Sequence, residues 1–252
     1  MTLSWTLDKL GPICRSVEDC AVVFGAIHGQ DHRDSSTVDR PFDWPARRRM
    51  ETIRVGYLAE RKDEFKTELD VLKGLGVQLV PIEIPENPLA RMLSIILTAE
   101  CSSVFDELTR RQEPKGVKYW PTTFAMGQFI LANDYIRAHR VRRQLMEEMK
   151  SVMRSVDVIF GPSMMNTTNM TGHPQIVLPN GFREPENSQP KTPTSVTFTG
   201  RLYDETTMMA VADAYQKATG HHLNRPPIDD FAGRVDDFNA ESDLLDEERL
   251  YD

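Results

Sequence analysis

Hydrophobic positions recur along much of the chain at helical spacing or in alternation. The first such stretch follows Ser16, which can cap a helix, and stops at Gly29, which can end one. Its apolar positions lie three or four residues apart, at Val17, Cys20, Ala21, Phe24 and Ile27. This spacing predicts a helix with one face against a core.

The next elements predict a β-α-β unit. Residues 53–58 are typical of a strand, residues 64–73 of a short helix, and residues 77–84 of a second strand with alternating apolar positions. A strand, a helix and a second strand in this order favour parallel pairing with a right-handed crossover.

Further elements follow the same alternation of strand and helix. Long helices are predicted over residues 89–111 and 122–153 with a turn at 113–116, strands at 156–160 and 194–199, and a helix at 204–219. We find no internal repeat. Strands interleaved with helices indicate the α/β class.

Composition narrows the functional classes. The 252 residues carry a formal net charge of −8, which argues against a general nucleic-acid-binding protein. No apolar run approaches the roughly 20 residues that cross a bilayer, and the first residues lack the layout of a secretory signal. We therefore expect no membrane partner and a cytoplasmic location. The three cysteines, Cys14, Cys20 and Cys101, are predicted to be core residues.

The acidic charge is concentrated at the C-terminal end. Residues 229–252 contain ten acidic and two basic side chains, whereas residues 1–228 sum to zero. Pro226 and Pro227 precede this stretch and end whatever element comes before them. We predict a folded domain over residues 1–228 and an acidic tail over 229–252, which either solvates the protein or docks on a partner.

No catalytic motif stands out from the residues alone. The chain has no phosphate-binding glycine loop, no H-E-x-x-H and no C-x-x-C. Ser163 lacks the closing glycine of a nucleophile elbow, and Pro190 breaks the turn that would bring Lys191 to Ser188. The basic residues between 137 and 143 are predicted to form a solvated helix face rather than an anion site. We therefore predict no catalytic residue and no metal ligand.

Two stretches together resemble the amidase signature family of serine hydrolases. Residues 6–21, TLDKLGPICRSVEDCA, are similar to the family segment D-x-x-G-P-x-x-R-[ST]-V-x-D-x-A. Residues 169–182, NMTGHPQIVLPNGF, are similar to N-x-[TA]-G-x-P-[AG]-x-x-x-P-x-G-[FY], and residues 193–205 to the stretch that follows it. The resemblance covers residues 1 to about 228 and implies a mixed β-sheet covered by helices, incomplete on its N-terminal side.

The resemblance also implies an activity and a missing part. Relatives hydrolyse carboxylic amides to an acid and ammonia or an amine with a Ser-Ser-Lys triad, which lies ahead of the segment matched by residues 8–21. No residue matches those three positions, and neither Ser4 nor Lys9 fits their pattern. The expected chain is the C-terminal part of an amidase, inactive alone, acting on a small-molecule amide once complete. The chemistry needs side chains and water, so no cofactor is implied.

Two alternatives stay open. One is a catalytically dead amidase fold kept for binding, with self-association or a separate N-terminal portion as its partner; the other is a component of a larger assembly, similar to the amidase-like polypeptide of glutamyl-tRNA amidotransferase. The position of the second motif near the substrate implies a pocket wall at Asn169, Thr171, Gly172 and His173. His173 is expected either to donate a hydrogen bond to a substrate carbonyl or to cap a turn.

Overall fold

The computed structural model describes residues 2–84, 92–111, 120–184 and 191–225. The chain divides into two units, residues 1–222 and 223–252, and of the second only residues 223–225 are described. The acidic tail, the turn at 113–116 and the Ser188–Pro190 segment lie outside the described residues. The tail and the boundary at residue 228 therefore stay predictions.

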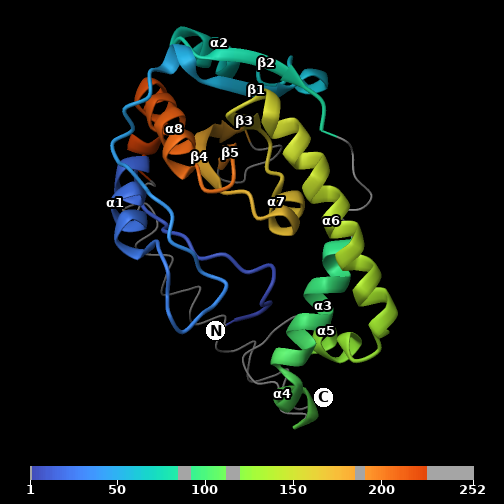
Figure 1. The fold of residues 1–252 in the computed structure, drawn as a ribbon. Helices are drawn as coiled ribbons and strands as arrows, with labels where there is room; N and C mark the ends of the chain where they lie inside the picture. Colours follow the sequence, from blue (N-terminus) through green and yellow to red (C-terminus); the bar gives the residue numbers. More distant parts are fainter. Residues whose placement is uncertain (1, 85–91, 112–119, 185–190, 226–252) are drawn as a thin grey trace, which may run out of the picture. The chain divides into compact units, whose positions relative to one another are not determined.

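The first unit is built on a five-stranded mixed sheet (Figure 1). The strands lie in the order β2-β1-β3-β5-β4. Their bounds are β1 Arg54–Leu58, β2 Gln78–Ile82, β3 Val158–Gly161, β4 Gln175–Arg183 and β5 Thr192–Gly200. β1 pairs in parallel with β2 and β3, whereas β5 pairs antiparallel with β3 and β4. The parallel β1–β2 pair, joined through α2 (Lys66–Gly74), confirms the predicted β-α-β unit.

Helices cover both faces of the sheet. On one face α1 (Val17–Ile27), α2 and α8 (Glu205–Thr219) pack on β3 and β5, with Phe160 and Phe198 in the shared core. On the other face Met149 and Met153 of α6 (Ala132–Ser155) pack on Ile159. Successive residues of β3 thus point to opposite layers, which explains why this strand is apolar throughout.

Local capping contacts set the ends of two predicted helices. The Ser16 side chain accepts a hydrogen bond from Asp19 N at the start of α1, as its sequence predicts. The Asp204 side chain caps α8 in the same way by accepting from Thr207 N. Gly220, with a positive φ, ends α8.

The two long helices predicted in the middle of the chain are each broken, so this prediction is wrong in detail. The first is α3 (Leu93–Val104) followed by α4 (Asp106–Arg110), and the second is α5 (Trp120–Gly127) followed by α6. The break between α5 and α6 follows Gly127, whose missing side chain lets α5 approach α3: a Cβ there would lie 2.3 Å from Thr98 O. Apolar periodicity continues across the break, so it did not reveal the turn.

Gly127→Ala tests this close approach. The added methyl would also lie 2.3 Å from Ser102 Cβ, and we expect the free energy of unfolding to fall by about 2 kcal/mol as α3 and α5 move apart. Urea denaturation measures the change. Gly74→Ala in α2, where nothing lies within 4 Å of the new Cβ, is the control and should be neutral or slightly stabilising. Equal effects of the two substitutions would contradict the packing argument.

Several predictions about single side chains need correction. Cys101 is buried as predicted, but Cys14 is exposed and Cys20 only partly buried. Arg142 does not belong to a solvated face, because it is half-buried and donates hydrogen bonds to two backbone carbonyls. Within the described residues, no helix is both long and apolar enough to span a membrane.

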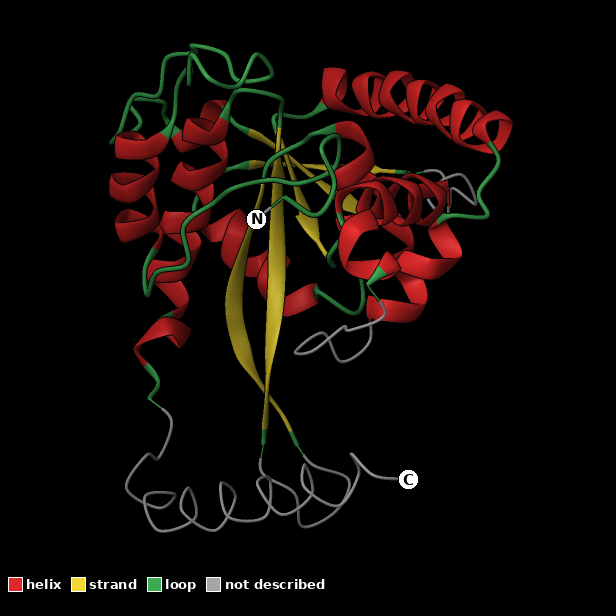
Figure 2. Cartoon of the chain, turned by 90° about the horizontal axis from the view of Figure 1, so that it is seen from below, coloured by secondary structure: helices red, strands yellow, loops and turns green. Residues whose placement is uncertain are grey.

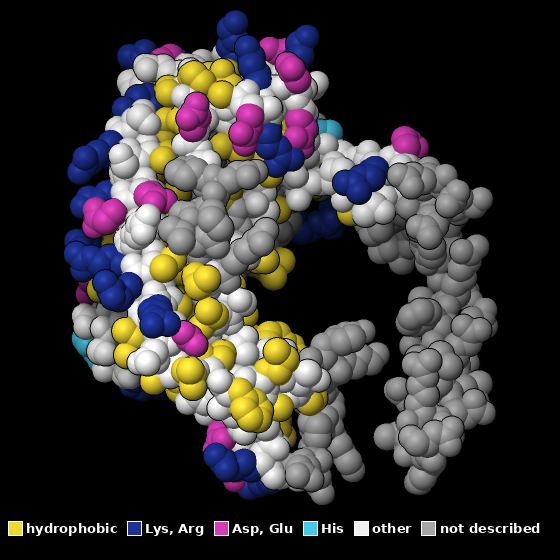
Figure 3. Space-filling model, turned by 90° about the vertical axis from the view of Figure 1, so that its right-hand side faces the viewer, with side chains coloured by type: hydrophobic (Ala, Val, Ile, Leu, Met, Phe, Trp, Pro, Cys, Tyr) yellow, Lys and Arg dark blue, Asp and Glu magenta, His cyan; other side chains and the backbone are white. Residues whose placement is uncertain are grey.

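The surface of the first unit carries exposed apolar side chains. Figure 3 shows them gathered in its lower part, the level at which α3 and α5 lie in Figure 1. Phe129 and Leu131, between α5 and α6, are 84% and 65% exposed. The β4–β5 pair, nine residues in each strand, forms a long two-stranded ribbon (Figure 2). β4 has only β5 as a neighbour among the described strands.

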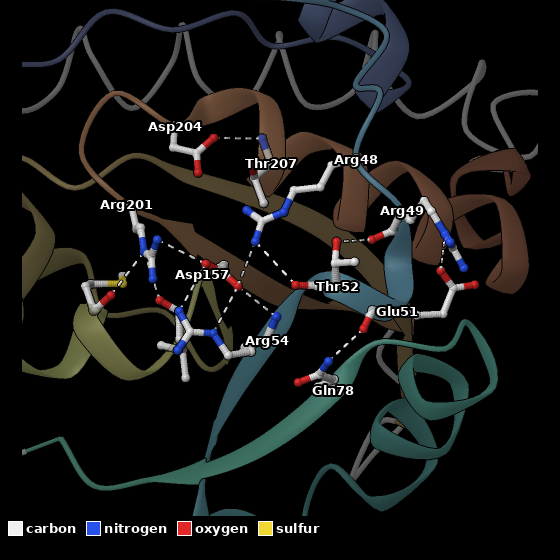
Figure 4. A network of polar contacts seen from close by, with 12 residues as sticks. Arg48, Arg49, Glu51, Thr52, Arg54, Gln78, Asp157, Arg201, Asp204 and Thr207 are labelled. Atoms are coloured by element: carbon white, nitrogen blue, oxygen red, sulfur yellow. Dashed lines mark hydrogen bonds and ion pairs between the residues drawn. The ribbon is translucent and has the colours of Figure 1, made fainter.

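A buried carboxylate ties the chain together where β1 and β3 begin (Figure 4). Asp157 is 1% exposed and accepts from Arg54 N at 2.9 Å, with the Arg54 guanidinium at 3.3 Å. Arg48 and Arg201 add ion pairs at 3.2 and 3.0 Å. Burial alone would raise the pKa of Asp157, but the hydrogen bonds from Arg54 and the charges of Arg201 and Arg48 outweigh it and hold this pKa below its usual value.

Candidate functional site

The four residues predicted as a pocket wall lie together in one short segment. Asn169 and Thr171 belong to α7 (Met165–Thr171), Gly172 ends this helix, and His173 leads into β4. Gly172 adopts φ +84°, a left-handed conformation that favours glycine, and donates its N–H to Thr168 O at 2.8 Å. The glycine of the motif is therefore explained by the helix end, and α7 itself was not predicted.

His173 is buried within this turn. The residue is 3% exposed, and Nδ1 lies 2.8 Å from Thr171 Oγ1. Burial, and then the positive charge of Lys9, lower the pKa of His173 to about 4. The imidazole is therefore neutral at pH 7.

Two basic side chains from distant parts of the sequence hold the C-terminal end of α7. Lys9 Nζ donates to Thr168 O at 2.9 Å and to His173 O at 3.0 Å. Arg142 Nε donates to Met170 O at 2.6 Å, and its Nη2 donates to Thr6 O at 2.7 Å. Cations are favoured at this end of a helix, where carbonyl groups lack partners. Burial, and then the charge of Arg142, lower the pKa of Lys9 to about 8.

A second buried carboxylate anchors the segment that carries Lys9. Glu100 of α3 is 4% exposed and accepts from Thr6 N at 3.1 Å, Thr6 Oγ1 at 2.7 Å and Tyr135 OH at 2.8 Å. The Ser4 hydroxyl also donates to it. Burial alone would raise the pKa of Glu100, but these hydrogen bonds outweigh it and lower the pKa. Residues 4–6 are thereby held between α3 and α6.

These contacts define what the segment can do chemically. The Ser4 hydroxyl is fully buried and donates to a carboxylate, so it is not placed as a nucleophile, and both hydrogen bonds of Lys9 run to carbonyls. No group of three metal-ligating side chains occurs in the part of the chain that the structure describes. The turn from α7 into β4 offers a rigid, neutral surface suited to binding rather than to bond cleavage.

Sequence reasoning found the turn but missed the residues that hold it. Lys9, Arg142 and Glu100 were not predicted as part of the site. Lys9 lies inside the first motif, and His173 inside the second, so the joint presence of both motifs was the only sequence signal that they meet. The direct contact joins residues 164 positions apart.

Solved structures identify the fold as that of amide-hydrolysing enzymes. The peptide amidase of Stenotrophomonas maltophilia aligns with a TM-score of 0.71 at 20% identity, over 90% of this chain and 56% of that one. A second match is the glutamyl-tRNA(Gln) amidotransferase of Thermotoga maritima, through its component designated A. It aligns with a TM-score of 0.66 at 23% identity, over 85% of this chain and 54% of that one.

Sequence comparison gives the family. The model of the Amidase family matches residues 2–199, and the chain belongs to this family. The corresponding component of the glutamyl-tRNA(Gln) amidotransferase of Burkholderia mallei is 25% identical over 291 aligned positions, which cover 88% of this chain and 58% of that protein. The chain thus spans little more than half the length of the relatives it matches.

Proposed function

We propose that this chain supplies the sheet and one pocket wall of an amidase that hydrolyses a carboxylic amide to an acid and ammonia or an amine. The observation that carries the proposal is the turn from α7 into β4, which keeps the family motif and is held by Lys9 and Arg142. In this role Asn169, Thr171, Gly172 and His173 face the substrate.

We further propose that the chain is inactive by itself. A serine hydroxyl attacks an amide only when a base takes its proton, and no residue here matches the Ser-Ser-Lys triad of the family. The free edge of β4 and the exposed side chains Leu10 and Ile13, close to the site segment in sequence, support a further polypeptide that completes the sheet and the pocket.

An ammonia-release assay tests both statements. The purified 252-residue chain is expected to release no ammonia from benzamide or acetamide. Mixed with a polypeptide encoded just upstream that carries the lysine and the glycine- and serine-rich segment, it is expected to gain turnover. Turnover by the chain alone, with a serine-reactive probe attached within residues 1–252, would contradict the second statement. Unrelated upstream sequence together with no turnover in any mixture would favour a binding protein.

A further inference from the structure

The hydrogen bonds around Thr171 fix the tautomer of His173. Thr171 Oγ1 lies 3.0 Å from Thr167 O, and a carbonyl oxygen can only accept, so the one hydroxyl hydrogen of Thr171 is used in that bond. The same oxygen lies 2.8 Å from His173 Nδ1 and must accept there. His173 Nδ1 therefore carries the hydrogen.

The other ring nitrogen then has an unused lone pair. In a neutral imidazole with hydrogen on Nδ1, Nε2 is an acceptor and cannot donate. No described residue donates a hydrogen bond to His173 Nε2, although the residue is almost completely buried. A buried acceptor without a donor costs about 1–3 kcal/mol, so this nitrogen favours any ligand that brings an N–H or O–H group.

The surroundings keep this nitrogen an acceptor. Lys9 directs two of its three ammonium hydrogens to Thr168 O and His173 O, and its charge opposes protonation of the ring. Gly172, beside the ring along the chain, is exposed and has no side chain. The ring therefore lies directly beneath a surface that a small ligand can reach.

We propose that His173 Nε2 accepts a hydrogen bond from the amide N–H of the substrate and so selects amides that bear an N–H over fully substituted ones. The proposal rests on the function proposed above and assigns this residue a role in specificity. It replaces the expectation that His173 donates to the substrate carbonyl, which the tautomer forbids. Primary and secondary amides satisfy Nε2, whereas an N,N-dialkyl amide leaves it buried and unpaired.

Nitrogen NMR of the full 252-residue chain tests the tautomer. At pH 7 in ¹⁵N-labelled protein, Nδ1 of His173 is expected at the position of a protonated ring nitrogen and Nε2 at that of an unprotonated one, with assignment by His173→Gln. Thr171→Val removes the acceptor and should abolish the preference for hydrogen on Nδ1, whereas Thr171→Ser keeps the hydroxyl and should retain it. Hydrogen on Nε2 in the unsubstituted protein would overturn the proposal.

Titration with two matched amides tests the selectivity. Benzamide is expected to shift the Nε2 resonance upfield, with a dissociation constant about tenfold or more below that of N,N-dimethylbenzamide. Equal binding of the two amides, or no shift of Nε2 with benzamide because only water reaches it, would overturn the proposal. These readouts do not depend on turnover, so failure of hydrolysis in the ammonia assay is distinguishable from failure here.

Discussion

Replacing Asp157 with asparagine is expected to lower the free energy of unfolding by about 3 kcal/mol at pH 7, because the change leaves three guanidinium groups facing one another without the buried carboxylate that they share. The arginine side chains are about one-third exposed and can turn partly to water, which keeps the loss from being larger. Urea denaturation monitored by circular dichroism gives the value.

The pH dependence of the same variant provides an independent check. The pKa of Asp157 is lower in the folded protein than in the unfolded chain, so its contribution is present above the unfolded pKa and is lost as the pH falls through the folded pKa. The difference between the original protein and Asp157→Asn should therefore shrink below about pH 4. Asp134→Asn, which removes an exposed pair with Arg137, should change stability by less than about 0.5 kcal/mol. A difference that is constant with pH would contradict the ion-pair argument.

The elements that the sequence predicted well are those with local signals. Ser16 and Asp204 cap α1 and α8, and alternation marks the parallel strands. β4 was not predicted, because Pro179 and Gly181 interrupt its strand pattern. Its place at the edge of the described sheet explains why they are tolerated: a proline that cannot donate has no second neighbouring strand to satisfy there.

The candidate site was predicted only as far as the motif extended. The sequence placed Asn169 to His173 on one short segment, and the family resemblance gave that segment a role. The direction of the hydrogen bonds at His173 depends on Thr167 and Thr171, two ordinary threonines whose arrangement follows from α7, which was not predicted. The functional meaning of the histidine therefore required the three-dimensional positions of neutral neighbours rather than of charged ones.

Glu100→Gln is expected to lower the free energy of unfolding by about 3 kcal/mol, although glutamine has nearly the same shape. The contacts from Ser4, Thr6 and Tyr135 to this side chain all run from donors to the carboxylate. An amide accepts only at its oxygen, so its NH₂ group would face donors and leave at least one of them buried without a partner. Glu107→Gln, on an exposed side chain of the neighbouring α4, is the matched control and should be close to neutral.

The consequence for the site distinguishes this role of Glu100 from general stabilisation. Glu100 holds Thr6, Thr6 O accepts from Arg142, and Lys9 follows three residues later with its hold on the carbonyls of α7. Hydrogen exchange under native conditions should therefore accelerate in residues 4–9 and 168–173 of Glu100→Gln, while the amides of β1 and β3 keep their protection relative to global unfolding. Uniform acceleration across the whole unit would mean that the carboxylate stabilises the fold without positioning the turn that contains His173.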